Sequence, residues 1–470
     1  MPANSILLLT LLIPLFGVGR ILRINEKDFS TNIKLVSIWT ATFTFLLSLT
    51  LFLSTNGKFS FFDLQFSINS ISTYMISMTT FLTLISVCIG YDRINFQLKK
   101  FHALVLILEF FSIMLFSTND ILIFYILFEL ILITTFILVG IFTGNSIGSS
   151  KFFTILSIGS VFIFFAVIYL IETAGITEID ILSKYTFKHE QECMIFAMFF
   201  TGFACQTALF PLHIWLTDSC NESPTPVSIL LSGILLKIGV FGMMTILLPI
   251  AKNINLLLRG YILIFSTITI GYATLSALLQ RNMKKIVVCI SIIHMAIITI
   301  GIFSCRVDGI SGAFLNILSS GLITTACLLV IDIFENRCRN YSPTDVSGTP
   351  ATLPYISTMA LIPMLAIAFT SPLPCFIGDF LIMSEWKNSS FIFLILYSLA
   401  TWSAFHGFKT YQNTLFNECN LAKLRPTNNE LICLPPLVIL ILVVGIYPKI
   451  ILQPTKDEIS KICLWNNRND

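Results

Sequence analysis

The amino-acid sequence predicts an all-α polytopic membrane protein. Of its 470 residues, 56% are hydrophobic and only 11% are charged, whereas soluble domains carry about 25% charged residues. A helix that spans the bilayer needs about 20 mostly apolar residues. Runs of this kind begin near residues 3, 33, 70, 102, 119, 150, 194, 225, 257, 284, 309, 354, 389 and 432. We therefore expect about fourteen transmembrane helices. Polar and apolar residues alternate within residues 56–69, which predicts a short pair of surface strands.

Several kinds of site have no signature in this sequence. No Gly-x-Gly-x-x-Gly fingerprint follows a strand, and no phosphate-binding P-loop is present. The 12 cysteines include no Cys-x-x-Cys pair and no metal-ligand spacing with histidine. We therefore expect no cofactor, metal or nucleic acid to bind this chain. The N-terminus shows neither an Arg- and Ser-rich presequence nor a signal-cleavage site, so the first apolar run is interpreted as a retained helix.

Lysine and arginine predict how the chain crosses the membrane. They are concentrated in the connections that follow odd-numbered helices, for example at Arg20, Arg23 and Lys99. Because such residues stay on the matrix or cytoplasmic side, both termini should lie on the opposite, outer side. Lys284 stands at the start of a helix on the inner side, and we expect it to anchor that helix at the lipid headgroups.

Three ionisable residues lie inside apolar runs, namely Glu129, Lys237 and Asp379. A charge near the centre of a transmembrane helix costs at least roughly 2.5–3.5 kcal/mol, so such a residue faces the bundle interior, a water-filled cavity or a partner of opposite charge. Ionisable groups spread through several membrane helices favour a pathway for protons or ions.

Two of the predicted helices should be broken. The seventh contains Pro211, and the twelfth contains Pro372 and Pro374. Proline removes a backbone donor, and free carbonyls at membrane depth are tolerated only where protein or a cavity surrounds them. The two breaks take the fourth place in two blocks of five helices, 4–8 and 9–13, which is typical of a transporter built from repeats. Two ordinary proline kinks are the alternative.

The residues around these features resemble those of the antiporter-like membrane subunits of respiratory complex I. Segment 124–130 (Phe-Tyr-Ile-Leu-Phe-Glu-Leu) matches the glutamate helix of that family, and 235–239 (Leu-Leu-Lys-Ile-Gly) matches its lysine helix. The remaining matches keep the same order, at 211–216, 222–225, Lys284, 291–295, 312–315 and 378–380. The 235–239 sequence and the length of the chain favour the subunit 4 branch over those of subunits 2 and 5.

The resemblance implies fourteen helices, with helices 4–8 and 9–13 as inverted repeats. The expected units are residues 1–100 (helices 1–3), 101–252 (first repeat), 253–411 (second repeat) and 412–470 (helix 14 and a C-terminal tail). The resemblance also implies a place in the membrane arm of an NADH:ubiquinone reductase of the mitochondrial inner membrane. There the chain would lie beside subunits like 2 and 5 and lipids such as cardiolipin. NADH, FMN, iron–sulfur clusters and ubiquinone are expected in other subunits.

In the family a line of buried charged residues carries protons at the membrane midplane. Carried over to this chain, the line comprises Glu129, Lys237, His294 and Asp379, the last replacing a glutamate. Redox chemistry in other subunits drives proton movement along it. The resemblance therefore implies that these four residues form the catalytic part of a proton-translocating subunit that has no redox site of its own.

The sequence departs from the family at important positions. Gln206 stands where a lysine normally pairs with the glutamate, and Ser320 replaces a midplane histidine. Together with His213, which follows Pro211, these residues are candidates for the proton path. Glu109, in the run that begins near residue 102, matches no motif.

These departures leave two other functions open besides proton translocation within complex I. The chain could be a cation/proton antiporter, alone or in a multi-subunit complex. It could also be a scaffold subunit that has lost pumping.

Overall fold

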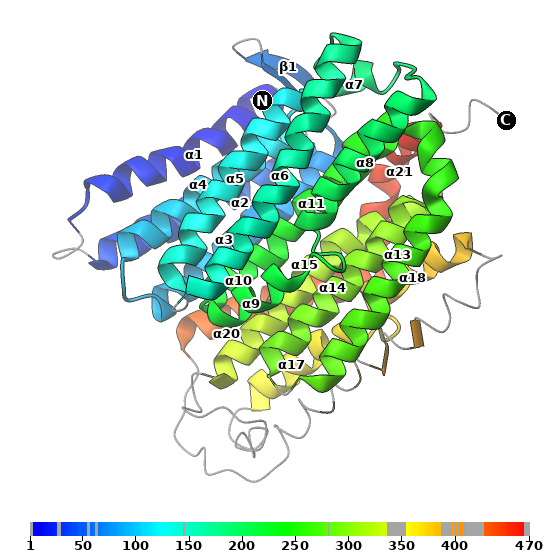
Figure 1. Ribbon diagram of the computed structural model, residues 1–470. Helices are drawn as coiled ribbons and strands as arrows, with labels where there is room; N and C mark the ends of the chain where they lie inside the picture. The colour runs from blue at the N-terminus through cyan, green and yellow to red at the C-terminus, as the bar shows by residue number, and fades with distance from the viewer. Residues whose placement is uncertain are drawn as a thin grey trace.

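The computed structural model describes residues 3–386 and 427–464, apart from 26–29, 54–56, 62–63, 144–145, 281 and 336–353, together with isolated positions between 397 and 409. This part of the chain is a bundle of long helices that run side by side (Figure 1). Eleven of the described helices are long and apolar enough to cross a membrane. Two more predicted helices are broken, and the helix predicted near residue 389 lies largely outside the described residues. The predicted fold class is confirmed.

The first four long helices form one edge of the bundle. They are α1 (Ala3–Arg23), α2 (Ser30–Thr50), α3 (Ser70–Arg93) and α4 (Leu98–Ser117), with a short 3-10 turn η1 (Leu51–Leu53) after α2. Helix α1 packs against α2 and α4 at the margin of the molecule (Figure 1). Strands β1 (Gly57–Phe61) and β2 (Leu64–Ile68) form an antiparallel hairpin, as the alternation in residues 56–69 predicts.

The next helices lead to the first break. They are α5 (Ile121–Phe142), α6 (Ser146–Ala174), the short α7 (Ile179–Leu182), α8 (His189–Gln206) and α9 (Ile214–Glu222). Helix α5 begins at residue 121 because the Asp120 carboxylate accepts hydrogen bonds from the backbone N–H groups of Leu122 and Ile123. The following span is one continuous buried helix made of α10 (Thr225–Leu230), the π-turn η2 (Leu231–Leu235), α11 (Leu236–Gly242), the π-turn η3 (Met243–Leu247) and α12 (Leu248–Ile250).

The second half of the chain packs around a fully buried helix. This helix is α15 (Val307–Glu335). It packs against α14 (Met283–Ile302), α17 (Pro354–Ile367), α18 (Pro374–Glu385), α20 (Asn428–Ile446) and α21 (Lys449–Leu464). Helix α13 (Lys252–Leu279) covers α14 from outside and exposes many apolar side chains. A helix that is apolar on its outward face and longer than the bilayer core fits a lipid environment.

Both predicted breaks are present, between α8 and α9 and between α17 and α18. Each contains a residue with positive φ three positions before the proline, Ala208 (φ 54°) before Pro211 and Phe369 (φ 56°) before Pro372. Pro374 is the first residue of α18. At the first break the Trp215 indole N–H donates to the carbonyl of Cys205 (2.9 Å). A buried side chain therefore satisfies a carbonyl at the end of α8.

Helix α21 lies in the part of residues 412–470 that the sequence predicts to be a tail after helix 14, so its helical structure is a difference from the prediction. It packs on α15 and α3. The Glu458 carboxylate accepts hydrogen bonds from the N–H groups of Ser70 (2.8 Å) and Ile71 (3.0 Å), at the start of α3. This carboxylate caps α3, and its negative charge interacts favourably with the positive end of the helix dipole. The hairpin, α7 and α21 thus mark one end of the bundle, here named the outer end.

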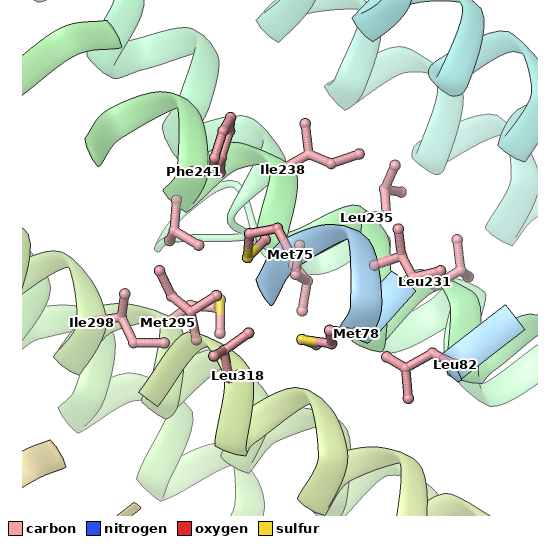
Figure 2. Close-up of a cluster of buried hydrophobic side chains, with 14 of the residues drawn as sticks. Met75, Met78, Leu82, Leu231, Leu235, Ile238, Phe241, Met295, Ile298 and Leu318 are labelled. Atoms are coloured by element: carbon pink, nitrogen blue, oxygen red, sulfur yellow. The ribbon is translucent and has the colours of Figure 1, made fainter. Parts of the chain in front are cut away.

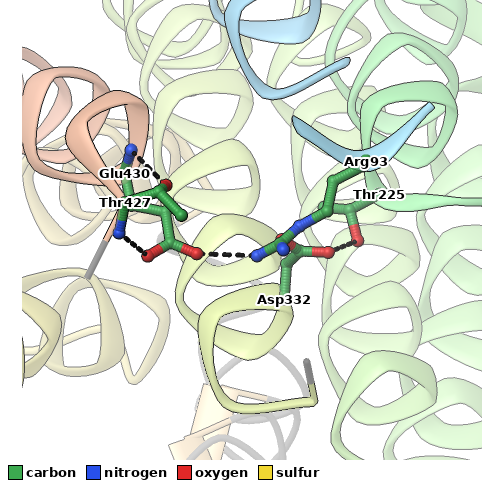
Figure 3. Close-up of polar contacts among 5 residues, drawn as sticks. All are labelled: Arg93, Thr225, Asp332, Thr427 and Glu430. Carbon is green, nitrogen blue, oxygen red and sulfur yellow. Dashed lines mark hydrogen bonds and ion pairs between the residues drawn. The ribbon is translucent and has the colours of Figure 1, made fainter. Parts of the chain in front are cut away.

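The opposite end, here named the inner end, carries Arg20, Arg23, Lys34, Arg93 and Lys99. An ion cluster joins four helices there (Figure 3). Arg93 donates to Asp332 (2.7 Å) and to Glu430 (2.6 Å). Asp332 also accepts the Thr225 hydroxyl (2.7 Å), and Glu430 forms a capping box with Thr427 at the start of α20. The single cation thus holds two buried carboxylates from α15 and α20 against the ends of α3 and α10.

Helices α15 and α18 approach most closely at two glycines. A Cβ added at Gly378 would lie 2.1 Å from Asn316 Oδ1 and 2.8 Å from the Gly312 carbonyl oxygen, and a Cβ added at Gly312 would lie 2.6 Å from the Gly378 carbonyl oxygen. Only glycine fits at either position without displacing the other helix.

The first prediction concerns this contact. Gly378→Ala should lower the stability of the assembled protein by about 1–3 kcal/mol, as overpacked cores do, because backbone atoms would have to move. Gly271→Ala in α13 is the matched control, since nothing lies within 4 Å of its added Cβ. Thermal denaturation of the two variants in detergent measures the difference, and equal midpoints would contradict the prediction.

The second prediction concerns the ion cluster. Arg93→Met leaves Asp332 and Glu430 buried without their cation, so we expect a loss of about 3–5 kcal/mol of stability. Arg306→Met removes an ion pair to Glu385 in which the arginine side chain is 64% exposed, and it should cost only about 0–1 kcal/mol. The same denaturation measurement compares them; a loss for Arg93→Met no larger than for Arg306→Met would count against the cluster's role.

Candidate functional site

Lys237 lies near the middle of a helical span that is 94% buried, and the residue itself is 1% exposed. Its ammonium donates a hydrogen bond to the carbonyl oxygen of Ser232 (3.2 Å). The π-turns η2 and η3 flank α11 on both sides, and π-turns inside helices frequently occur at functional sites. In the described part of the chain, no carboxylate forms an ion pair with Lys237. The ammonium therefore depends on a backbone carbonyl for its partner.

An apolar cluster surrounds the helix segment that carries Lys237 (Figure 2). Met75, Met78 and Leu82 of α3 reach towards the span from Leu231 to Phe241, and Met295, Ile298 and Leu318 close the cluster from α14 and α15. A Cβ added at Gly321, next to Ser320, would lie 1.9 Å from the methyl carbon of Met78. The space beside Lys237 on this side is therefore filled by side chains.

Gln206 is the last residue of α8 and meets the lysine helix directly. Its side-chain amide donates to the Leu235 carbonyl oxygen (3.0 Å), while its own carbonyl oxygen has no partner among the described residues. A Cβ added at Gly239 would lie 3.0 Å from Gln206 Cβ and 2.7 Å from Thr207 Cγ2. Gly239 thus lets the end of α8 reach the segment that carries Lys237.

Glu129 lies on α5 and is half-buried. Its carboxylate accepts the hydroxyl of Tyr125, one turn earlier on the same helix (2.7 Å). The expected neighbour, Gln206, donates to α11 and not to Glu129. The structure therefore does not join the first two members of the predicted line by a direct contact, and it adds Tyr125, whose i, i+4 spacing to Glu129 is a recognisable signal.

Asp379 lies on α18 and is fully buried. Its Oδ1 accepts the side-chain amide of Asn316 on α15 (2.6 Å), while Oδ2 has no partner in the described residues. Cys375, one turn earlier, donates to the Ser319 hydroxyl (3.5 Å). Asn316 and Cys375 were missed in the sequence, since neither residue type indicates a membrane site by itself.

His294 and Ser320 are both buried. Neither ring nitrogen of His294 has a hydrogen-bond partner in the described part of the chain. The imidazole packs against Phe369 at the second break (4.7 Å between ring centres) and is close enough to Lys237 for an electrostatic interaction. The Ser320 hydroxyl donates within its own helix to the Ile317 carbonyl (3.3 Å). His294 therefore belongs with Lys237, whereas the structure gives Ser320 only a local contact.

His213 lies in the first break, beside helix α13. Its ring stacks against Phe210 and contacts Tyr272 edge-on (5.9 and 4.7 Å between ring centres), and its Nδ1 has no described partner. These contacts hold the loop between α8 and α9 against α13.

Lys284 differs from the sequence expectation of a headgroup anchor. It is buried, and its ammonium donates to the Ser223 carbonyl oxygen at the end of α9 (2.5 Å). The Asn282 side chain caps α14 at the same place. Lys284 therefore fixes the end of α9 to the start of α14, and the lysine-containing motif is the signal that could have indicated this.

A cavity of about 610 Å³ opens at the outer end above the lysine helix. Its lining includes Asn119, Asp180, Phe241 and Glu458. Phe241 is one turn after Lys237. The described residues contain no cluster of three or more His, Cys, Asp or Glu side chains that could hold a metal ion. The ammonium, imidazole and carboxyl groups of this site are of the types that can bind and release protons, whereas the Gln206 amide can only hydrogen-bond.

Comparisons with known proteins identify the family of this chain. Residues 118–403 match the family described as NADH:quinone oxidoreductase/Mrp antiporter, TM. NADH-ubiquinone oxidoreductase chain 4 of Chondrus crispus is 31% identical over 464 residues, with 94% of each chain covered.

The fold is shared with two kinds of solved complex. One is respiratory complex I from Thermus thermophilus with bound NADH (TM-score 0.88, 21% identity, 98% of this chain and 100% of the other covered). The other is the Mrp complex from Dietzia sp. DQ12-45-1b (TM-score 0.85, 14% identity, 100% and 98% covered). The chain therefore belongs to the NADH:quinone oxidoreductase/Mrp antiporter family of multi-pass membrane proteins, in the group of complex I subunit 4.

Proposed function

We propose that this chain is a proton-translocating subunit of the membrane arm of an NADH:ubiquinone oxidoreductase. The observation that carries the proposal is the burial of Lys237, with no carboxylate partner among the described residues, in a helix with a π-turn on each side. A lysine desolvated in this way can give up its proton, and a permanently charged structural lysine would be expected to have a paired anion.

The geometry supports a sequence of proton sites across the bundle. Glu129 and the Tyr125 hydroxyl form the first hydrogen-bonded site. Gln206, held to the Leu235 carbonyl, orients the path towards Lys237 without carrying charge. Lys237 passes its proton towards His294, whose ring nitrogens have no hydrogen-bond partner among the described residues. Asp379, which accepts a hydrogen bond from Asn316, forms the last site. His213 fixes the first break, and Ser320 contributes only through water.

The energy for transport comes from outside this chain. Moving one charge against the membrane potential requires about 2.3 kcal/mol per 100 mV. NADH, FMN, iron–sulfur clusters and ubiquinone bind in other subunits, and their redox reactions supply the energy. The partners are membrane-arm subunits like 2 and 5 and lipids such as cardiolipin. The complex lies in the mitochondrial inner membrane, with both termini on the intermembrane-space side.

A cation/proton antiporter is the second candidate, because the same fold occurs in the Mrp complex. At 14% identity that likeness shows the fold alone, whereas the Chondrus crispus relative, at 31% identity, is a subunit 4. A scaffold without pumping is favoured by two neutral residues, Gln206 and Ser320, at positions that the resemblance assigns to charged or titratable groups.

Native electrophoresis of solubilised membranes separates the complex I and antiporter proposals. We expect peptides of this chain in a very large band that oxidises NADH in the gel. If the chain migrates apart from that activity, the proposal fails and ion-gradient assays of antiport become the next measurement.

The third prediction tests proton transport by the assembled complex in vesicles. Glu129→Gln and Lys237→Ala should each lower proton translocation by at least about tenfold, because proton-transfer groups contribute about 10²–10⁴-fold to rates. Lys151→Ala is the matched control, since that lysine is 44% exposed and pairs with Asp218 at the surface. Unchanged protons per NADH oxidised in both Glu129→Gln and Lys237→Ala would support the scaffold function.

A further inference from the structure

Helices α2, α3 and α4 enclose a buried carboxyl group that lies outside the motif residues. Glu109 on α4 is 0% exposed. Its Oε1 accepts the Thr44 hydroxyl of α2 (2.7 Å), and the Thr83 hydroxyl of α3 lies beside the same carboxyl group. Its Oε2 has no hydrogen-bond partner in the described residues. A carboxyl group at this depth with an unused oxygen is a candidate functional site.

Glu109 lies at the depth of the midplane residues. It stands eight residues before the outer end of α4, and Glu129 stands eight residues after the outer end of α5. At a rise of 1.5 Å per residue, both are about 12 Å from the outer ends of their helices. The carboxyl group is therefore far from both surfaces.

A histidine lies on the same face of α4, towards the inner end. His102 is seven residues before Glu109, or about two turns, and it is 0% exposed. Neither of its ring nitrogens has a described partner. Lys34 of α2, which donates to the Tyr91 carbonyl at the inner end, interacts electrostatically with His102. His102 is thus placed between the inner end and Glu109.

Hydroxyl groups line the faces of α2 and α3 around these two residues. The α2 hydroxyls recur every three or four residues and so share one face; they belong to Ser37, Thr40, Thr44 and Ser48. The α3 hydroxyls also recur every three or four residues and share one face; they belong to Thr73, Ser77, Thr80 and Thr83. The two rows meet where Ser48 and Thr80 form a hydrogen bond (2.9 Å). Asn69 and Ser72, at the outer end of α3, line the cavity of about 610 Å³.

The opposite face of α3 is apolar. Met75, Met78 and Leu82 point into the cluster beside the Lys237 helix (Figure 2). This face separates Glu109 from Lys237, so the polar rows of α2 and α3 do not join the motif residues through α3. Hydroxyl rows alone are common at helix contacts in membranes. Two fully buried titratable side chains distinguish this one, because in the described residues His102 has no hydrogen-bond partner and Glu109 has none at Oε2.

We propose that His102 and Glu109 form a second proton route through α2, α3 and α4, from the inner end to the outer cavity. A proton from inner-side water binds a ring nitrogen of His102, leaves it for Glu109 Oε2, and passes along the hydroxyl row of Ser48, Thr80, Ser77 and Thr73 to the cavity. Each step breaks one N–H or O–H bond and forms another. Water molecules carry the proton where two successive side chains are not in contact. The route rests on the proposed function, because redox chemistry elsewhere in the complex drives it.

The fourth prediction tests this route in vesicles that contain the whole complex. Glu109→Gln keeps the size of the side chain and a Thr44 acceptor but cannot carry a proton. We expect it to lower the protons moved per NADH oxidised, and Glu109→Asp to restore part of the loss. Glu172→Gln, at an exposed carboxylate of α6, is the matched control and should leave the ratio unchanged.

Infrared difference spectra during NADH oxidation give an independent readout, because the protonated carboxyl group of Glu109 should add a C=O band that is lost in Glu109→Gln. Thr44→Val, which is isosteric, should shift that band and lower the ratio even if Glu109→Gln fails to assemble. An unchanged proton ratio together with an unchanged band in Glu109→Gln would overturn the second route.

The comparison with Lys237→Ala separates this proposal from the proposed function. Loss of transport in Lys237→Ala but not in Glu109→Gln would reject the second route alone. Loss in Glu109→Gln but not in Lys237→Ala would reject the assigned role of Lys237 and keep the route through α4.

Discussion

The burial of the Lys237 ammonium is the constraint on which the rest of this structure depends. At membrane depth every polar group has to find its partner within the protein, and within the described residues Lys237 pairs with a backbone carbonyl and with no anion. The π-turns beside α11 widen the helix, and carbonyls of η2 accept hydrogen bonds from two side chains, that of Lys237 at Ser232 and that of Gln206 at Leu235. The irregular helix and the buried charge are therefore one feature.

The same requirement explains where helices break and how closely they pack. Trp215 satisfies the Cys205 carbonyl at the first break, and Asn316 satisfies one oxygen of Asp379 just after the second. The Asn316–Asp379 contact lies where α15 and α18 approach over Gly312 and Gly378, and the end of α8 approaches the Lys237 helix over Gly239. Within the described residues, Asp379 Oδ2 and both ring nitrogens of His294 are among the buried polar atoms that keep no hydrogen-bond partner, and they are therefore available for protons.

The sequence allowed prediction of features that depend on local chemistry. Hydropathy predicted the positions of the helices, and proline predicted the positions of the breaks. A charge inside an apolar run identified Lys237. Features that depend on distant residues could not be predicted. Glu458 caps α3 from a position 388 residues away from Ser70, and the polar residues of α21 do not resemble a membrane span. Lys284 was interpreted as a surface residue because its partner, the Ser223 carbonyl, is brought to it only by the first break.

The neutral amide at position 206 changes how the two halves of the predicted line can influence one another. Two opposite charges 4 Å apart near a protein surface interact by about 4 kcal/mol, whereas a neutral hydrogen bond contributes about 0.5–1.5 kcal/mol. Gln206 holds α8 against the Lys237 helix, but it cannot form or break an ion pair with Glu129, which bonds to Tyr125 instead. A neutral Gln206 offers no ion pair at position 206 that could open and close. Coupling between Glu129 and Lys237 in this chain therefore has to act through movement of hydrogen-bonded protons.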